Sequence, residues 1–111
     1  MKSIMQTDDS ICYICGKPIT SNRDLHHVFN GAYKKRSEND AMLIWAHHCC
    51  HMWLHEHPIS NKTIKARAER IWRSHYGKTK EEFIERYGKS YEADEQGRIC
   101  DVYDIEEQQE G

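Results

Sequence analysis

The apolar positions of the chain begin with two short runs that predict a pair of β-strands. The segment Arg23–Phe29 places apolar residues around a histidine pair, and Ala41–Ala46 is a continuous apolar run. A run of this length suits a buried strand and is too short for a helix of its own. Between the two runs, Asn30–Asp40 is polar and is expected to be a loop that carries a basic cluster.

The residues after the second run show helical spacing and helix-ending signals. A short helix over His47–Glu56 is expected to end before Pro58, because the residue that precedes a proline disfavours the helical region. A longer helix is expected from an N-cap at Ser60 to about Tyr76, closed by Gly77. Its expected inner face consists of residues that recur at helical spacing: Ile64, Ala68, Ile71, Trp72 and His75.

A capping-box pattern predicts one more helix. Thr79 and Glu82 stand three positions apart, at the start of an expected helix whose inner face carries Phe83, Ile84 and Tyr87 and which stops before Gly88. Beyond this stretch, only Ile99–Tyr103 has the pattern of an edge strand, and no internal repeat is visible. Two strands with several helices predict a small α+β fold.

Length and composition limit the fold further. The 111 residues amount to about one domain, of which 38% are hydrophobic and 31% charged. So small a hydrophobic core is expected to need an additional cross-link, such as a structural metal or disulfides. Eight histidines and five cysteines are the candidate residues for it. No run approaches the roughly 18 apolar residues of a membrane span, and the first ten residues lack the apolar centre of a signal peptide. We therefore expect a cytoplasmic protein rather than a transmembrane protein, a secreted precursor or a fibrous repeat.

The net charge of -2 averages two unlike parts of the chain. Residues 1–91 carry 15 basic and 10 acidic side chains, whereas residues 92–111 carry 1 basic and 8 acidic ones. A basic body fits a phosphate-bearing partner. The acidic tail is interpreted mainly as a disordered, solubilising segment, and a mimic of nucleic acid that shields the basic body is the second interpretation.

Four residues predict a structural zinc site. Because the cysteines are odd in number and no export signal precedes them, metal binding is favoured over a disulfide framework. The candidate ligands form two knuckle-like pairs about thirty residues apart: Cys12 and Cys15, and His47 and Cys50. His48 and Cys49 compete for places in the second pair. Cys100 has no partner in this arrangement and is expected to be a buried free thiol.

A second group of histidines has the spacing of an open metal site. His51 and His55 stand four positions apart, so on a helix they share one face and can hold one ion. Neighbouring residues of a strand point to opposite sides, so one of His26 and His27 can join this ion while the other faces a substrate. Three neutral imidazoles leave positions open for water and phosphate, which is typical of a catalytic site.

The histidine-rich segments resemble a known family of nucleases. DLHHVFNGAYKKRSEND (residues 24–40) and WAHHCCHMWLHEHP (residues 45–58) are similar to the ββα-metal motif of HNH (His-Me finger) endonucleases. The double histidine resembles that of nuclease colicins, and the wider chain resembles small phage-type members with a CxxC knuckle. The resemblance implies a nuclease domain over residues 1–91 in a bacterial or phage-infected cell. The implied ββα-metal core covers about residues 24–57, and a helical C-terminal portion covers residues 60–91.

The same resemblance implies metal-dependent hydrolysis of phosphodiester bonds, with DNA as the expected substrate and with 5′-phosphate and 3′-hydroxyl products. His27 would be the general base that activates water. The implied ligands are His26, His51 and His55 for the catalytic ion, and Cys12, Cys15, His47 and Cys50 for a structural Zn²⁺. Three imidazoles favour Zn²⁺, Ni²⁺ or Mn²⁺ as the catalytic ion in vitro, while Mg²⁺ could serve in the cell.

One position departs from the family pattern. HNH motifs usually place an asparagine nine residues before the first helix histidine, where it steadies the loop of the general base. Here that position is Met42. Asn39 or Asp40 could take the role from a shifted loop, or the backbone could orient His27 alone.

Basic residues near the histidines are the candidates for contacts with nucleic acid phosphates. They are Lys34, Lys35 and Arg36 between the expected strands, with Arg23 behind them. The main alternative function is a zinc-dependent nucleic-acid-binding module without catalysis, which has no need of a second histidine beside a ligand. A purely structural domain with two closed zinc sites is a third possibility.

Overall fold

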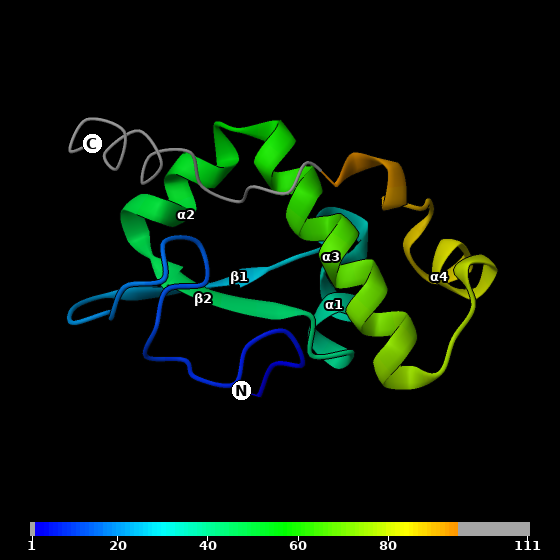
Figure 1. Cartoon of the computed structure of the whole chain (residues 1–111), viewed down its shortest axis with the longest axis horizontal. Helices are drawn as coiled ribbons and strands as arrows, with labels where there is room; N and C mark the ends of the chain where they lie inside the picture. The colour runs from blue at the N-terminus through cyan, green and yellow to red at the C-terminus, as the bar shows by residue number, and fades with distance from the viewer. Residues whose placement is uncertain (1, 96–111) are drawn as a thin grey trace, which may run out of the picture.

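The computed structural model describes residues 2–95 as a small α+β fold around a two-stranded antiparallel sheet (Figure 1). β1 (Arg23–His27) pairs with β2 (Leu43–His47) in a register that sets His26 opposite Ile44. The helices of the described residues are α1 (Lys34–Asn39), α2 (His48–His55), α3 (Pro58–Tyr76) and α4 (Lys80–Tyr87), with single 3₁₀ turns η1 (Gly31–Tyr33) and η2 (Glu92–Asp94). The predicted α+β class is confirmed.

Apolar side chains explain the burial of β2. Leu43, Ile44 and Ala46 are each at most 1% exposed, although successive residues of a strand point to opposite faces. On its free edge, β2 is covered by the N-terminal segment: the Tyr13 amide donates to the Trp45 carbonyl at 2.9 Å. The edge of β2 that faces away from β1 is therefore partly covered.

An aromatic cluster joins the end of the sheet to α3 and α4. The Phe29 ring lies 4.3 Å from the Tyr87 ring and 5.6 Å from the Phe83 ring, measured between centroids. Trp72 of α3 meets Phe83 edge-on at 5.5 Å. All four side chains are at most 4% exposed, and burying each contributes about 1.5–3 kcal/mol.

The signals at both ends of α4 are confirmed. The Glu82 amide donates to the Thr79 hydroxyl at 3.1 Å, and the Thr79 amide donates to the Glu82 carboxylate at 3.1 Å. At its other end, Gly88 has a φ of 88°, and a β-carbon there would overlap with the Tyr33 hydroxyl. Both the conformation and the space require glycine. Ile84, expected on the inner face, is instead 38% exposed.

The predicted start of the long helix is wrong by three residues. α3 begins at Pro58 rather than after Ser60, with His57 as its N-cap. Proline suits this first position because its missing N–H would have no intrahelical partner there and its φ is already helical. The expected end is confirmed, since Gly77 closes α3 with a φ of 64°. His75, expected on the inner face, is exposed.

The segment expected to be a polar loop between the strands contains helix α1. Its anchor is Ser37, which is fully buried. The Ser37 hydroxyl donates to the Met42 carbonyl at 2.7 Å and accepts from the Phe29 amide at 3.2 Å. A single buried hydroxyl gives no apolar periodicity, so the polar composition of the segment concealed the helix.

Asp40, at the C-terminal end of α1, ties this helix to α3 and α4. Its carboxylate accepts from the Arg86 guanidinium at 2.5 and 2.8 Å. It also accepts from the Tyr87 hydroxyl at 2.6 Å and from the Trp72 indole at 2.8 Å. Charge-assisted bonds of this kind are stronger than neutral ones, and the paired geometry fixes the direction of the Arg86 side chain.

A buried carboxylate fixes the chain after α4 against α3. Glu69 is fully buried and accepts from the Tyr91 amide at 2.6 Å and from the Ser90 hydroxyl at 2.8 Å. The following acidic residues pair with the basic face of α3: Arg73 with Glu92, and Arg70 with Glu95. Basic residues of α3 therefore hold the beginning of the acidic segment.

Two sequence predictions, the edge strand Ile99–Tyr103 and the buried thiol of Cys100, lie outside the described residues. Within residues 2–95, no helix combines the length and the apolar character that crossing a bilayer requires.

Replacing Asp40 should destabilise the protein without changing any of the predicted metal ligands. Asp40→Ala leaves the buried Tyr87 and Trp72 donors and the partly exposed Arg86 guanidinium without their acceptor, at an expected cost of about 1–3 kcal/mol. Urea unfolding at pH 7 measures the loss. The control Glu85→Ala removes an exposed carboxylate of α4 and should change stability by less than about 0.5 kcal/mol.

Candidate metal centres

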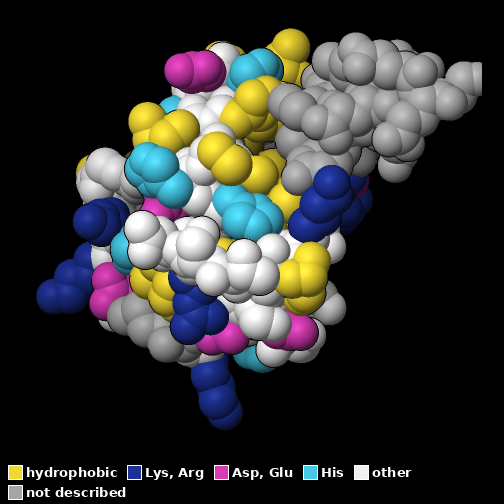
Figure 2. All heavy atoms as spheres, turned by 90° about the vertical axis from the view of Figure 1, so that its left-hand side faces the viewer, with side chains coloured by type: hydrophobic (Ala, Val, Ile, Leu, Met, Phe, Trp, Pro, Cys, Tyr) yellow, Lys and Arg dark blue, Asp and Glu magenta, His cyan; other side chains and the backbone are white. Residues whose placement is uncertain are grey.

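The start of α2 is the meeting point of two groups of metal-ligating side chains. β2 ends at His47 and α2 begins at His48, so Cys50 and His51 lie consecutively in the first turn of the helix. Figure 2 views the end of the molecule where α2 lies and shows histidine side chains gathered on this face. One group combines Cys12, Cys15, His47 and Cys50, and the other combines His26, His51 and His55.

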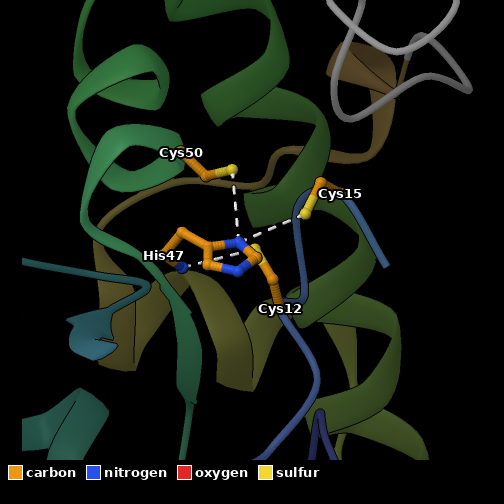
Figure 3. Close-up of side chains that lie close together, drawn as sticks. All are labelled: Cys12, Cys15, His47 and Cys50. Atoms are coloured by element: carbon orange, nitrogen blue, oxygen red, sulfur yellow. Dashed lines mark hydrogen bonds between the residues drawn. The ribbon is translucent and has the colours of Figure 1, made fainter. Parts of the chain in front are cut away.

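The first group brings together a turn near the N-terminus and the junction of β2 with α2 (Figure 3). Nδ1 of His47 lies 3.3 Å from Sγ of Cys15 and 3.9 Å from Sγ of Cys50. One ligand atom from each of the four residues fits within a span of 4.8 Å. Tetrahedral ligands at about 2.0–2.3 Å from zinc are separated by roughly 3.3–3.8 Å, so this cluster could hold such an ion.

Backbone groups orient this cluster. Nε2–H of His47 donates to the Pro18 carbonyl at 3.0 Å, which leaves Nδ1 with its lone pair toward the sulfurs. The His47 amide points at Sγ of Cys12, 3.4 Å away. The sequence left His48 and Cys49 as competing ligands, but both are exposed and neither belongs to the cluster.

The charge balance of the cluster also fits a cation. Burial, together with the neighbouring Cys12 and Cys15 thiols, raises the pKa of Cys50 well above the ordinary value of a thiol. Crowded sulfurs cannot all ionise next to one another unless a positive charge offsets their repulsion. A divalent metal supplies that charge and takes up the thiolates as ligands.

The second group joins β1 to one face of α2. Nδ1 of His26 lies 3.1 Å from Nε2 of His51, which lies 3.0 Å from Nε2 of His55. His51 and His55 are one turn apart on the helix, as their spacing predicted. Three ring nitrogens that face one another from different elements fit a shared ion held at about 2.0–2.1 Å, with room for further ligands.

Asp24 orients this second group, and the sequence pattern did not single it out. Its carboxylate accepts from Nδ1–H of His51 at 2.8 Å, which leaves Nε2 of His51 free for the cluster. A second bond, from Nδ1 of His48, also measures 2.8 Å. The hydrogen bond from His51, followed by that from His48, lowers the pKa of Asp24. The available signal was its position two residues before His26, on the same face of β1.

His26 is the buried member of the group, at 3% exposure. Burial lowers its pKa to about 3, so the ring is neutral at physiological pH, as a metal ligand must be. Its Nε2 is buried and has no hydrogen-bond partner among the described residues. An unsatisfied buried group costs about 1–3 kcal/mol, and a ring held by its Nδ1 atom on an ion explains an orientation that leaves Nε2 unpaired.

His27 points to the other side of β1, as strand alternation predicts. Its side chain is 14% exposed and takes no part in the three-histidine cluster. Nε2 of His27 lies 3.2 Å from a carboxylate oxygen of Glu38 on α1. The histidine pair is therefore divided between a buried cluster and a partly exposed position next to it.

The basic candidates for phosphate contacts have two different environments. Arg36 donates to the Arg86 carbonyl at 2.7 Å, and Arg23 pairs with Asp9 at 3.1 Å while its guanidinium lies 4.6 Å above the centre of a Trp45 ring. Lys34 and Lys35 are exposed at the start of α1 and form no ion pair with a described residue. They remain available to a ligand.

Comparison with protein-family models, with curated proteins and with solved structures finds no match to this chain. The geometry of the two clusters thus carries the functional argument.

A metal held by the first cluster should be released when one of its sulfurs is removed, and the fold should then lose stability. Cys12→Ser is expected to lower the metal content of the purified protein by one ion per chain. Losing a structural metal should reduce stability by more than about 4 kcal/mol. Elemental analysis and thermal unfolding measure the two effects.

The matched control is Cys49→Ser, which changes an exposed thiol beside the cluster. It should retain both the metal and the melting temperature. Equal metal content in both variants would contradict the assignment of Cys12 as a ligand.

Proposed function

We propose that this protein is a metal-dependent endonuclease of the HNH (His-Me finger) type, with His27 as general base and DNA as substrate. One observation carries the proposal: the two consecutive histidines of β1 lie in different environments. His26 joins His51 and His55 in a cluster suited to an open metal site, and His27 stands partly exposed on the other side of the strand. A binding module needs no such second histidine.

The order of elements supports the proposal. An antiparallel pair of strands precedes a helix that offers two histidines on one face, and β1 supplies the third. This is the arrangement that a ββα-metal motif requires. We further propose that Cys12, Cys15, His47 and Cys50 hold a structural Zn²⁺ at the beginning of the same helix.

Different residues of this chain would have different roles in hydrolysis. His26, His51 and His55 would hold a divalent ion, which supplies charge stabilisation for the phosphate and the leaving 3′ oxygen. Asp24 keeps His51 in the tautomer that offers Nε2. His27 would accept a proton from the attacking water, a contribution of roughly 10²–10⁴-fold.

Lys34 and Lys35 are the proposed contacts with the nucleic acid backbone. They lie at the start of α1, the same helix that brings Glu38 to His27. Exposed lysines can neutralise phosphates and release their counterions, which supplies affinity without sequence specificity. The helix would therefore place the phosphate contacts on the side of the sheet that carries the general base.

The decisive test is cleavage of plasmid DNA with Mg²⁺, Mn²⁺, Ni²⁺ or Zn²⁺ added to the zinc-loaded protein. His27→Ala should reduce the cleavage rate by about 10²–10⁴-fold while metal binding is kept. His75→Ala, which changes an exposed histidine of α3 outside both clusters, should cleave like wild type. Binding of DNA by wild type without cleavage under any metal would favour the non-catalytic module instead.

Removing the two free lysines should weaken binding in a salt-dependent way. Lys34→Ala with Lys35→Ala should lower DNA affinity and reduce the slope of log affinity against log salt by about 2, roughly 1 per lost phosphate contact. Lys78→Ala removes a lysine that pairs with Glu82 in the α3–α4 region and should leave the slope unchanged. An unchanged slope in the double variant would show that these lysines do not contact phosphate.

A further inference from the structure

We propose that Glu38 is the positioning residue of His27, in place of the asparagine that Met42 replaces. The inference rests on the proposed nuclease function and assigns a residue that the sequence pattern does not single out. The Glu38 carboxylate would accept a hydrogen bond from Nε2–H of His27, since the nitrogen and the carboxylate oxygen lie 3.2 Å apart. Nδ1 of His27 is left with its lone pair and has no hydrogen-bond partner among the described residues.

The tautomer decides which atom of His27 can act as a base. A neutral imidazole has one N–H and one lone pair, and a carboxylate can only accept. Glu38 therefore favours the proton on Nε2 and the basic lone pair on Nδ1. A carboxylate in this position also stabilises the positive charge that the ring gains when it takes a second proton.

In the hydrolysis that this arrangement would serve, two bonds change at phosphorus. The oxygen of water forms a bond to phosphorus as its proton passes to Nδ1 of His27, and the bond from phosphorus to the 3′ oxygen breaks. The leaving oxygen takes a proton from solvent. Glu38 takes up no proton in this step and contacts neither the attacking water nor the phosphate, so it acts through His27 alone.

The other candidates for this role have other partners or make no contact with His27. The Met42 carbonyl, at the position of the family asparagine, accepts from the Val28 amide at 3.1 Å and from the Ser37 hydroxyl at 2.7 Å. Its two lone pairs are thereby occupied. The Asp40 carboxylate is bonded to Arg86, and Asn39 is an exposed residue of α1. Of the described residues, Glu38 provides the contact.

Backbone contacts hold Glu38 in place although its side chain is exposed. Ser37, its neighbour, is anchored between β1 and β2 by the two hydrogen bonds of its buried hydroxyl. The Glu38 carbonyl accepts from the Ala41 amide at 3.1 Å as the chain turns toward β2. Ala41 has a φ of 60°, a left-handed conformation that is unfavourable for alanine. The turn that brings Glu38 to His27 is thus fixed on both sides.

The test compares Glu38→Ala, Glu38→Gln and Asn39→Ala in the metal-loaded full chain. Glu38→Ala should lower kcat by about 10–100-fold with KM, metal content and melting temperature unchanged. Glu38→Gln keeps an acceptor oxygen but loses the charge, so its kcat should lie between those of Glu38→Ala and wild type. Asn39→Ala changes the neighbouring exposed residue of α1 and should match wild type. A fall in kcat for Asn39→Ala with none for Glu38→Ala would overturn the proposal.

A second readout does not depend on cleavage. The ¹⁵N chemical shifts of the His27 ring, measured about two pH units above the ordinary histidine pKa of about 6.5, report which nitrogen carries the proton. Wild type and Glu38→Gln should show the proton on Nε2, and Glu38→Ala should show a mixture of tautomers. Identical ring shifts in wild type and Glu38→Ala would refute the positioning role. A wild-type protein with the expected shifts but no nuclease activity would refute the proposed function and leave the contact in place.

Discussion

The three-histidine cluster depends on the register in which β1 pairs with β2. Arg23 lies opposite His47 and His26 lies opposite Ile44, so β1 carries Asp24 and His26 on the face toward α2. A slip of one residue reverses every side chain of a strand. In this chain, such a slip would exchange the surroundings of His26 and His27 and would turn Asp24 away from His51. Strand register is therefore the constraint that separates the two adjacent histidines.

Packing on both faces of β2 and the aromatic cluster hold this strand in place. Met42, Leu43 and Ile44 are nearly inaccessible, and moving any of them to solvent would expose a large apolar surface. At the other end of β2, the turn that contains Cys12 and Cys15 contacts His47, where the strand becomes α2. The sheet is thus fixed at one end by packing and at the other by a cluster of polar and sulfur ligands, a division that suits so small a core.

Local patterns predicted much of the fold and the members of both clusters, whereas long-range polar contacts were not predictable. The capping box of Thr79 with Glu82 and the spacing of His51 with His55 are local, and the sequence displays them directly. The partners of Asp24 and Glu38 lie 11 to 27 residues away, and an isolated acidic residue reads as ordinary surface. Helix α1 was missed for the same reason. Its anchor is Ser37, whose hydroxyl bonds to the backbone of Phe29 just after β1 and of Met42 just before β2.

The placement of Cys50 next to His51 has a consequence for how the length of this chain can vary. Each residue added to a helix rotates the rest of that helix by about 100°, since a turn holds 3.6 residues. An insertion between the two would leave Cys50 in its cluster and carry His51 and His55 away from His26. An insertion among residues 20–22, before β1, would displace no member of either cluster relative to its own element. Sequence length is therefore constrained at the start of α2 and less constrained at residues 20–22.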